Sequence, residues 1–126
     1  MLPKINPSQT KAWRQLAFHY KTAGKWQMKT FFETDPNRFE KFSLRFEDIL
    51  VDYSKNIIQD KTLNLLLKLA KECDLKTAID AMFGGEAINE TENRAVMHTA
   101  LRYRGNQPVK VSDRDVMPEV KAELNK

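Results

Sequence analysis

Three basic side chains recur at every fourth position in the last third of the sequence: Arg94, His98 and Arg102. They fall in the segment 89–104, NETENRAVMHTALRYR, whose apolar residues have the three- and four-residue spacing of an amphipathic helix. Side chains four residues apart share one face of a helix, so we call these three the basic stripe. Because guanidinium groups bind phosphate and carboxylate well, the basic stripe is a candidate anion site.

The same residues have a structural interpretation. Asn89 and Glu92 have the spacing of a capping box, which predicts that the helix begins at Asn89. Glu90 lies four residues before Arg94, where an ion pair along the helix would neutralise part of the stripe. Charge stripes are usually solvated or paired surfaces, so we favour this structural role over anion binding.

No other pattern in the sequence points to catalysis or to a cofactor. The four glycines match neither phosphate-binding loop, and Gly84-Gly85 is the usual ending of a helix. The histidines, His19 and His98, are far apart, and the single cysteine, Cys73, belongs to an apolar helical face. The remaining candidates are carboxylates in the first turns of predicted helices, where the helix dipole favours them. We therefore expect no catalytic residue, no metal site and no cofactor.

Composition and charge exclude several classes of protein. With 126 residues, of which 41% are hydrophobic and 30% charged, the chain has the size and balance of one globular domain, residues 1–126. Its net charge of +4 is scattered, and its aromatic residues do not alternate with basic ones, so we expect no nucleic-acid partner. It has no apolar stretch of membrane-spanning length and no secretory signal, and its lone cysteine favours the cytoplasm.

Most of the elements that hold these residues are predicted to be helical. Asn6, Pro7 and Gln9 form a capping box with proline in the first turn, which predicts a helix that ends at Gly24. Asp60 and Asp74 are expected to cap two further helices. The other predicted helices are a turn within 25–33, 38–41, the segment 89–104 and a last one after Asp115.

A change to two-residue periodicity predicts a β-hairpin in the middle of the chain. Phe42, Leu44 and Phe46 alternate with polar residues, Glu47-Asp48 is a plausible turn, and 49–53 is rich in β-branched and aromatic residues. We expect these strands to be half buried and to need a third strand or a helix against them, because an isolated hairpin is barely stable. A short strand is predicted at 109–111. The fold class is therefore α+β, mostly helical, with five to seven helices and a small hairpin or three-stranded sheet.

Four segments carry a family resemblance: INPSQTKAW, DILVDYSKN, LAKECDL with AIDAMFGGEAIN, and TENRAVMHTALR with DVMPEV. In order and in register, they resemble the N-terminal region of glucose-6-phosphate isomerases, most closely the bacterial ones. The resemblance implies the N-terminal part of an α/β sugar-isomerase-type protein. Its family interconverts glucose 6-phosphate and fructose 6-phosphate in glycolysis and gluconeogenesis, with no metal or organic cofactor.

The resemblance also implies what this chain lacks. The family's catalytic and phosphate-binding motifs lie later in a much longer polypeptide, so none is carried over to a residue here. The expected partners are the remainder of the isomerase chain and a second subunit of a homodimer. The helical pattern after Asp115 is unfinished at Lys126, which suggests a piece of a longer protein. We expect these 126 residues alone to be inactive, and to self-associate through surfaces that the missing domains would cover.

An alternative from a different class stays open. The chain could be a self-standing helical interaction module without chemistry, which binds a partner through an exposed apolar face.

Overall fold

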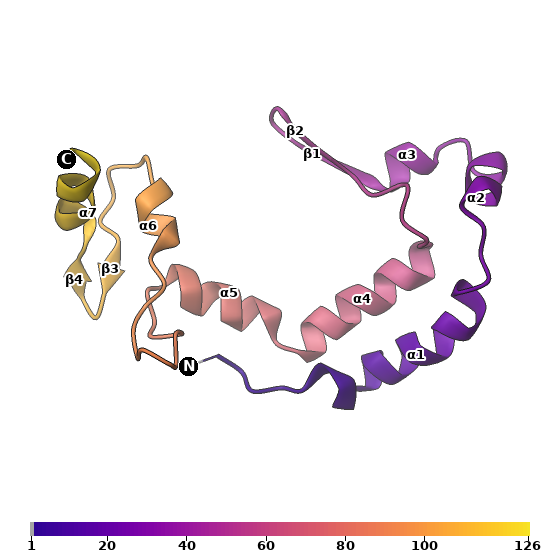
Figure 1. The fold of residues 1–126 in the computed structure, drawn as a ribbon, viewed down its shortest axis with the longest axis horizontal. Coiled ribbons are helices and arrows are strands. Elements are labelled where there is room, and N and C mark those ends of the chain that lie inside the picture. Colours follow the sequence, from indigo (N-terminus) through magenta and orange to yellow (C-terminus); the bar gives the residue numbers. More distant parts are fainter. Residues whose placement is uncertain (1) are drawn as a thin grey trace. The chain divides into compact units, whose positions relative to one another are not determined.

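The computed structural model describes residues 2–126, which divide into two compact units. One unit consists of residues 6–72, and the other of residues 73–126 with the N-terminal residues through Ile5 (Figure 1). The α+β, mostly helical class is confirmed. Among the helices of residues 2–126, none has the length and apolar character that crossing a bilayer requires.

The unit of residues 6–72 is built around two long helices and a hairpin. Its elements in order are η1 (Pro7–Gln9), α1 (Lys11–Ala23), α2 (Met28–Thr34), α3 (Arg38–Lys41), β1 (Ser43–Phe46), β2 (Ile49–Asp52) and α4 (Asp60–Glu72).

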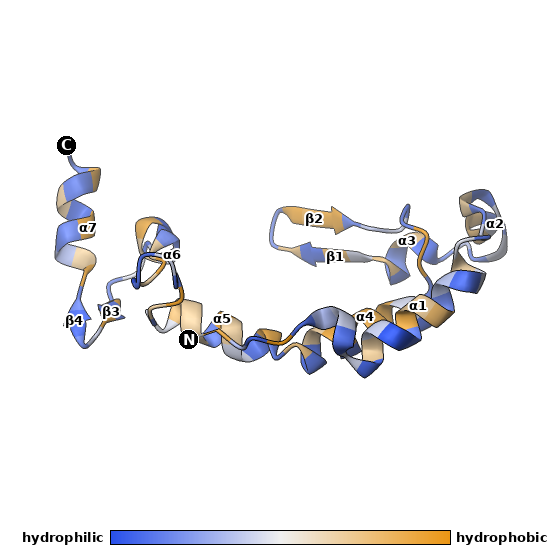
Figure 2. Ribbon diagram, turned by 60° about the horizontal axis from the view of Figure 1, so that its bottom comes forward, coloured by the Kyte–Doolittle hydropathy of each residue, from blue (hydrophilic) through white to orange (hydrophobic). Residues whose placement is uncertain are grey.

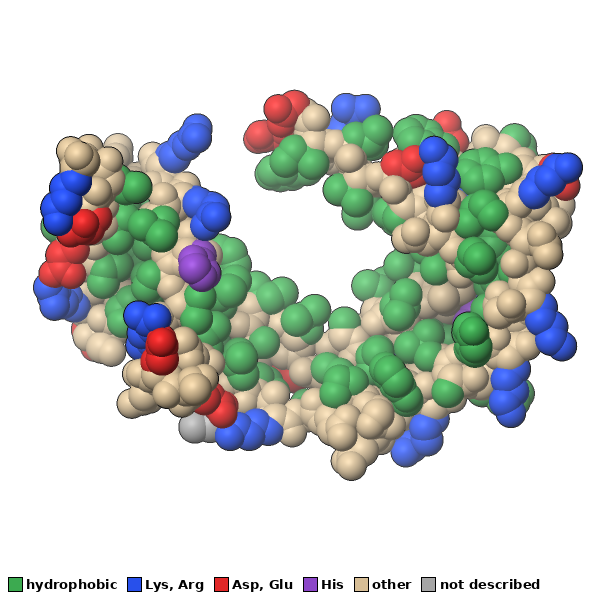
Figure 3. Space-filling model, in the orientation of Figure 1, with side chains coloured by type: hydrophobic (Ala, Val, Ile, Leu, Met, Phe, Trp, Pro, Cys, Tyr) green, Lys and Arg blue, Asp and Glu red, His purple; other side chains and the backbone are tan. Residues whose placement is uncertain are grey.

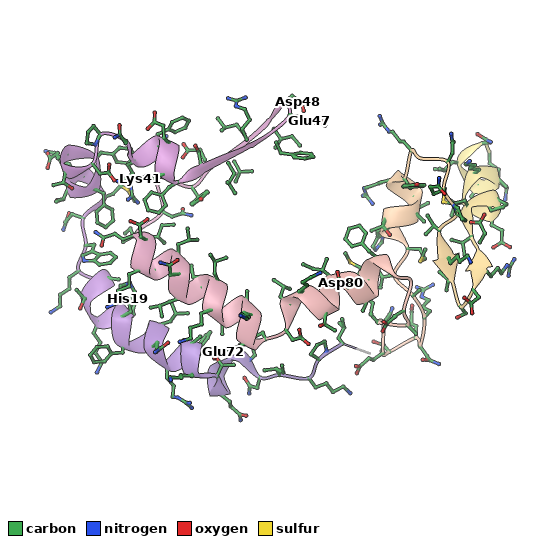
Figure 4. All side chains as sticks on the ribbon, turned by 180° about the vertical axis from the view of Figure 1, so that it is seen from behind. His19, Lys41, Glu47, Asp48, Glu72 and Asp80 are labelled. Atoms are coloured by element: carbon green, nitrogen blue, oxygen red, sulfur yellow. The ribbon has the colours of Figure 1, made fainter. Side chains whose placement is uncertain are left out.

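Helices α1 and α4 lie side by side and run in opposite directions. The Glu72 carboxylate, at the end of α4, accepts a hydrogen bond of 2.8 Å from the backbone N–H of Ala12 in the first turn of α1. Toward the other end of the pair, Nε2 of His19 lies 2.9 Å from Oγ1 of Thr62, and both side chains are buried (Figure 4). A carboxylate at a helix N-terminus satisfies a free N–H and complements the helix dipole, so Glu72 fixes the end of α4 to the start of α1.

The predicted start of the first helix is wrong by several residues. Asn6 does cap a turn, since its side chain accepts from the N–H of Ser8, but that turn is the 3₁₀-helix η1. Thr10 then adopts an extended conformation, and its hydroxyl accepts from the N–H of Trp13 at 3.1 Å. The α-helix therefore begins at Lys11, because threonine competes as a cap with the Asn6–Gln9 pattern. Gly24 ends the helix as predicted.

A chain of aromatic contacts forms the core of residues 6–72, and the buried side chain of Arg38 lies within it. The His19 ring packs edge-on against Trp26, and Trp26 against Phe31. The guanidinium carbon of Arg38 lies 4.5 Å from the ring centre of Phe31 and 4.6 Å from that of Phe42. Contacts between a cation and an aromatic face are stronger where water is excluded.

The same guanidinium group holds the segment that follows the hairpin. Its Nε donates to the carbonyl of Ser54 at 2.8 Å, and Nη2 donates to those of Asn56 and Ile58 at 2.8 and 3.0 Å. Arg38 is only 2% exposed. Three carbonyls of one loop are therefore satisfied by one side chain, and we call this arrangement the Arg38 clamp.

Two polar contacts flank the clamp, one exposed and the other partly buried. A hydrogen bond of 2.7 Å from Lys41 Nζ lowers the pKa of Asp35 and raises the pKa of Lys41. Hydrogen bonds from Ser54 lower the pKa of Asp52, whose Oδ1 accepts from the Ser54 N–H at 2.9 Å. Both contacts favour the ionised carboxylate and order the chain on either side of the hairpin.

The hairpin forms at the predicted place, but its burial was predicted wrongly. β1 and β2 are antiparallel, with Phe46 opposite Ile49 across a turn in which Glu47 is left-handed. Their apolar side chains are exposed, and Figure 2 colours most of β2 as hydrophobic. Neither the third strand nor the covering helix that half-burial requires lies on it within residues 6–72.

The second unit contains shorter elements. They are α5 (Leu75–Phe83), α6 (His98–Arg102), β3 (Lys110–Val111), β4 (Arg114–Asp115) and α7 (Met117–Leu124). The strand predicted at 109–111 does not join the first hairpin in a three-stranded sheet. It pairs with β4 through a two-residue turn in which Ser112 and Asp113 are both left-handed. This turn lacks the usual asparagine or glycine, which is why the pattern did not reveal it.

Caps in the second unit are partly as predicted. Asp74 precedes α5 in a left-handed conformation and accepts from the Thr77 hydroxyl, but it makes no cap to a backbone N–H. Gly84 and Gly85 end α5 as predicted: the N–H of Glu86 donates to the carbonyl of Ala81, and Gly85 is left-handed with φ 72°. This is the hydrogen-bonding pattern of a Schellman motif.

We expect Arg38→Met to lower the free energy of unfolding by at least about 3 kcal/mol, because three carbonyls in the loop lose their donor. Urea unfolding followed by tryptophan fluorescence measures this loss. The matched control is Arg45→Met on the exposed hairpin, for which a change within about 0.5 kcal/mol is expected. Equal losses in the two variants would contradict the clamp.

We expect Gly85→Ala to destabilise the second unit by at least about 1–2 kcal/mol, because left-handed backbone is costly for residues with a Cβ. The added Cβ would also lie 2.3 Å from the carbonyl oxygen of Lys110 in β3. Gly84→Ala is the control, since Gly84 has an ordinary φ of −74°. Amide hydrogen exchange across 110–124 should accelerate in the first variant only; unchanged exchange there would refute this account.

Candidate functional site

The structure separates the basic stripe instead of aligning it on one helix. His98 and Arg102 are the first and last residues of α6, whereas Arg94 precedes the helix. The predicted helix from Asn89 is therefore wrong over its first half. Residues 90–93 form a loop closed by two backbone hydrogen bonds between Asn89 and Arg94, at 3.1 and 3.3 Å.

The Asn89–Glu92 pair forms, but it stabilises that loop. The Asn89 side chain accepts from the N–H of Glu92 at 3.3 Å and donates to the Glu92 carboxylate at 3.1 Å. Asn93 is left-handed, with φ 49°, which a continuing helix excludes. The hydrogen bonds between Asn89 and Glu92 therefore stabilise a turn and not a helix start, because asparagine side chains can stabilise either.

The ion pairs around the stripe also differ from the prediction. Arg94 pairs with Glu92 through its Nε, and Glu90 pairs with Lys4 at 3.0 Å instead of with Arg94. Arg102 donates from Nη1 to the carbonyl of His98 at 3.2 Å, within its own helix. One cation is therefore partly neutralised by a carboxylate, and a second is engaged with the backbone.

Two of the three stripe residues do line one groove. It is formed by the loop at Asn89, the segment 94–98, Leu101 of α6 and Val120 of α7. Arg94 and His98 lie at this groove, and Arg102 does not. The rest of the lining is mostly apolar: Ala95, Val96, Met97, Leu101 and Val120. We call this the α6–α7 groove; its chemistry suits an apolar side chain better than an anion.

A second, more basic cleft lies between α1 and α4, and the sequence pattern did not reveal it. Lys11 and Arg14 of α1 and Lys61 of α4 line it, together with Phe18 and Leu65. Because Lys61 lies almost 50 residues after Lys11 and Arg14, no linear motif reports the three cations together. Among the residues that line this cleft, His19 is a buried polar side chain, and its Nε2 already contacts Oγ1 of Thr62.

Metal ligands do not gather in the described residues. Within 2–126, no three histidine, cysteine, aspartate or glutamate side chains are close enough to hold a metal ion. Cys73 is half-buried and forms no disulfide.

The comparison with known proteins identifies the family. Residues 52–126 match the family model described as phosphoglucose isomerase. The chain belongs to the phosphoglucose isomerase family. It is also similar to the glucose-6-phosphate isomerase of Christiangramia forsetii, with 54% identity over 119 residues. The resemblance predicted from the sequence motifs is thus confirmed.

The match to this glucose-6-phosphate isomerase covers nearly all of this chain but only a small part of the relative. It covers 94% of this chain but 22% of the relative, so the chain spans about a fifth of the length of that protein. The family model itself covers the end of the hairpin, α4 and the whole 73–126 segment, which includes the α6–α7 groove.

We expect phosphate to bind the basic stripe no better than it binds any exposed cation, because Arg94 is paired and the three side chains do not converge. Titration with inorganic phosphate, followed by NMR of the backbone and the His98 ring, measures this. Saturable shifts at Arg94, His98 and Arg102 together would contradict the prediction. Equivalent signals of Arg45 provide the control for unspecific binding.

Proposed function

We propose that this chain is the N-terminal portion of a glucose-6-phosphate isomerase, the enzyme that interconverts glucose 6-phosphate and fructose 6-phosphate in glycolysis and gluconeogenesis. The observation that carries the proposal is the 54% identity over 94% of this chain to a protein of that name. Agreement at this level across both structural units argues against a single borrowed motif.

In this proposal the chain is a scaffold and its catalytic groups lie elsewhere. The match spans only 22% of the relative, and Arg94 lies outside α6 and is paired with Glu92. The helices α1 and α4 and the hairpin supply surface and rigidity, while the sugar-isomerase domains supply the reactive groups. The whole enzyme works as a homodimer in the cytoplasm, and this chain has the remainder of its own polypeptide and a second subunit as partners.

Several large apolar side chains form a surface that a partner could cover. Trp13, Tyr20, Leu66 and Ile57 line a groove on the α1–α4 pair and are between 43% and 72% exposed. Exposed apolar area of this extent usually marks an interaction surface, and a longer polypeptide of the same family would supply its cover. A self-standing interaction module would have the same surface, but that role does not account for the 54% identity with an isomerase.

A coupled assay of fructose 6-phosphate formation tests the proposal. We expect residues 1–126 alone to give no turnover above the blank, because the reactive groups are absent. Mixing them with the separately produced remainder of the enzyme should restore isomerase activity, and size-exclusion chromatography should show the two parts eluting together.

The controls separate the two functional interpretations. The remainder alone, and the remainder with Arg38→Met in residues 1–126, should both show less activity than the wild-type mixture. Turnover by residues 1–126 alone would contradict the scaffold role. Failure to restore activity, together with tight binding to an unrelated protein, would favour the interaction module.

A further inference from the structure

The cleft between α1 and α4 is lined by cations that no carboxylate of residues 2–126 neutralises. Lys11, Arg14 and Lys61 line it, and no aspartate or glutamate is among the described residues that do. The three side chains are exposed, and none forms an ion pair within the described part of the chain. We call it the basic cleft; uncompensated positive charge of this kind attracts anions.

The surroundings of the basic cleft add to its charge. Helix α1 contains no acidic residue, and the sequence has none before Glu33. Figure 3 shows Lys and Arg side chains along α1. Lys68 of α4 donates from Nζ to Oε1 of Gln15, which lines the cleft, at 3.1 Å. The acidic residues of α4 are Asp60 and Glu72, at its two ends, and neither lines the cleft.

The two walls of the basic cleft are fixed relative to each other. Near one end, the Glu72 carboxylate of α4 accepts from the N–H of Ala12 in α1. Near the other, His19 of α1 contacts Thr62 of α4, and both side chains are buried. A cleft that is already formed loses less conformational freedom when a ligand binds, so more of the contact energy appears as affinity.

A cationic part and an apolar part of the cleft lie apart along α1. Lys11 and Arg14 are at the start of the helix, which Glu72 caps. Phe18 is about two turns further along, and its ring is 74% exposed. Seven residues of helix separate Lys11 from Phe18, a rise of about 10 Å. An occupant that uses both parts therefore carries most of its charge about 10 Å from its apolar group.

Lys61 and Leu65 of α4 provide the opposite wall near the apolar part. Lys61 precedes Thr62, whose hydroxyl contacts His19, the residue that follows Phe18. Leu65 is about one helical turn from Lys61 and lines the same cleft. An exposed aromatic ring beside a leucine suits a flat heterocycle, because nucleic-acid bases stack on aromatic side chains.

The volume and charge of the basic cleft favour a nucleotide over simpler anions. Its volume is about 450 Å³. Small-molecule sites in proteins have volumes of about 300–1,000 Å³. Inorganic phosphate would contact the cations and leave the aromatic ring uncovered. A fatty acid would bring a single charge to a cleft that offers three cations.

We propose that the basic cleft binds a nucleoside triphosphate, with its phosphates at Lys11 and Arg14 and its base on the exposed ring of Phe18. Lys61 supplies a third cation from the opposite wall. A sugar phosphate has no flat ring to stack, so this ligand differs in class from the substrates of the proposed isomerase. The site consists of residues of this chain, and it does not depend on the proposed function.

Isothermal titration calorimetry with ATP tests the site in the complete polypeptide that contains these residues. Saturating glucose 6-phosphate is present throughout, so that a substrate site elsewhere in the polypeptide is occupied. Magnesium is left out, so that the triphosphate keeps its full charge. Inorganic triphosphate, which lacks the base, and adenosine, which lacks the phosphates, are titrated in parallel.

We expect saturable binding of ATP, with an affinity at least about fivefold above that of inorganic triphosphate, because stacking of the base adds to the charge contacts. Adenosine should bind at least about fivefold more weakly than ATP, because it brings no charge to the cations. Equal affinities for ATP and triphosphate would indicate electrostatic attraction alone and would overturn the proposal. So would the absence of saturable ATP binding.

Two double variants test the role of the cations. Arg14→Gln with Lys61→Gln should lower the affinity for ATP by at least about fivefold, because two charge contacts are lost. Arg45→Gln with Lys25→Gln is the matched control, since it removes the same charge from exposed positions outside the cleft. Equal losses in the two double variants would place ATP elsewhere and refute the site.

A third variant tests the aromatic ring. Phe18→Ala should lower the affinity for ATP by at least about fivefold and leave that for inorganic triphosphate unchanged. The unchanged triphosphate affinity shows that the variant is folded. Phe46→Ala, at a similarly exposed position on the hairpin, should change neither affinity. Full ATP affinity in Phe18→Ala would contradict the assigned place of the base.

Discussion

A single guanidinium group connects three parts of residues 6–72. Arg38 lies between the rings of Phe31 and Phe42 and donates to carbonyls at three positions of the loop after β2. Helix α2, the base of the hairpin and the approach to α4 therefore depend on one side chain. A buried charge is tolerated here because the planar fork satisfies several acceptors at once, which a lysine ammonium on a flexible stem would not.

The fixed base of the hairpin explains why its outer half can remain uncovered in this chain. Phe42 and Tyr53 connect the base of both strands to the core, and the backbone pairing continues to the turn at Glu47. The long helices have a similar division, because Ala12 and His19 are buried where α1 meets α4 while Trp13 is 45% exposed. Exposed apolar side chains on the hairpin and on α1 occur in a chain that spans 22% of a longer relative.

The candidate site shows how far local patterns can mislead. Arg94, His98 and Arg102 have helical spacing, and the Asn89–Glu92 pair has the spacing of a cap. The same hydrogen bonds also stabilise a turn, and the bridge between Asn89 and Arg94 decides between the two. Arg38 shows the opposite failure: a lone arginine among phenylalanines gives no periodic signal, yet it organises the core. Its carbonyl partners lie 16 to 20 residues away, beyond the range of any helical or strand pattern.

Local signals in the sequence determined the end of the helix 11–23 but not its start, the helices 60–72, 75–83 and 117–124, the hairpin and its turn, and the family, because caps, periodicity and motifs act over a few residues. Tertiary structure alone decided which carboxylate caps α1, which strand pairs with β3, and that the basic stripe does not lie on one helix. It also decided that the hairpin is exposed, because periodicity shows which residues share a face but not whether anything covers it. Burial is a property of what surrounds a residue, and those surroundings come from distant parts of the chain.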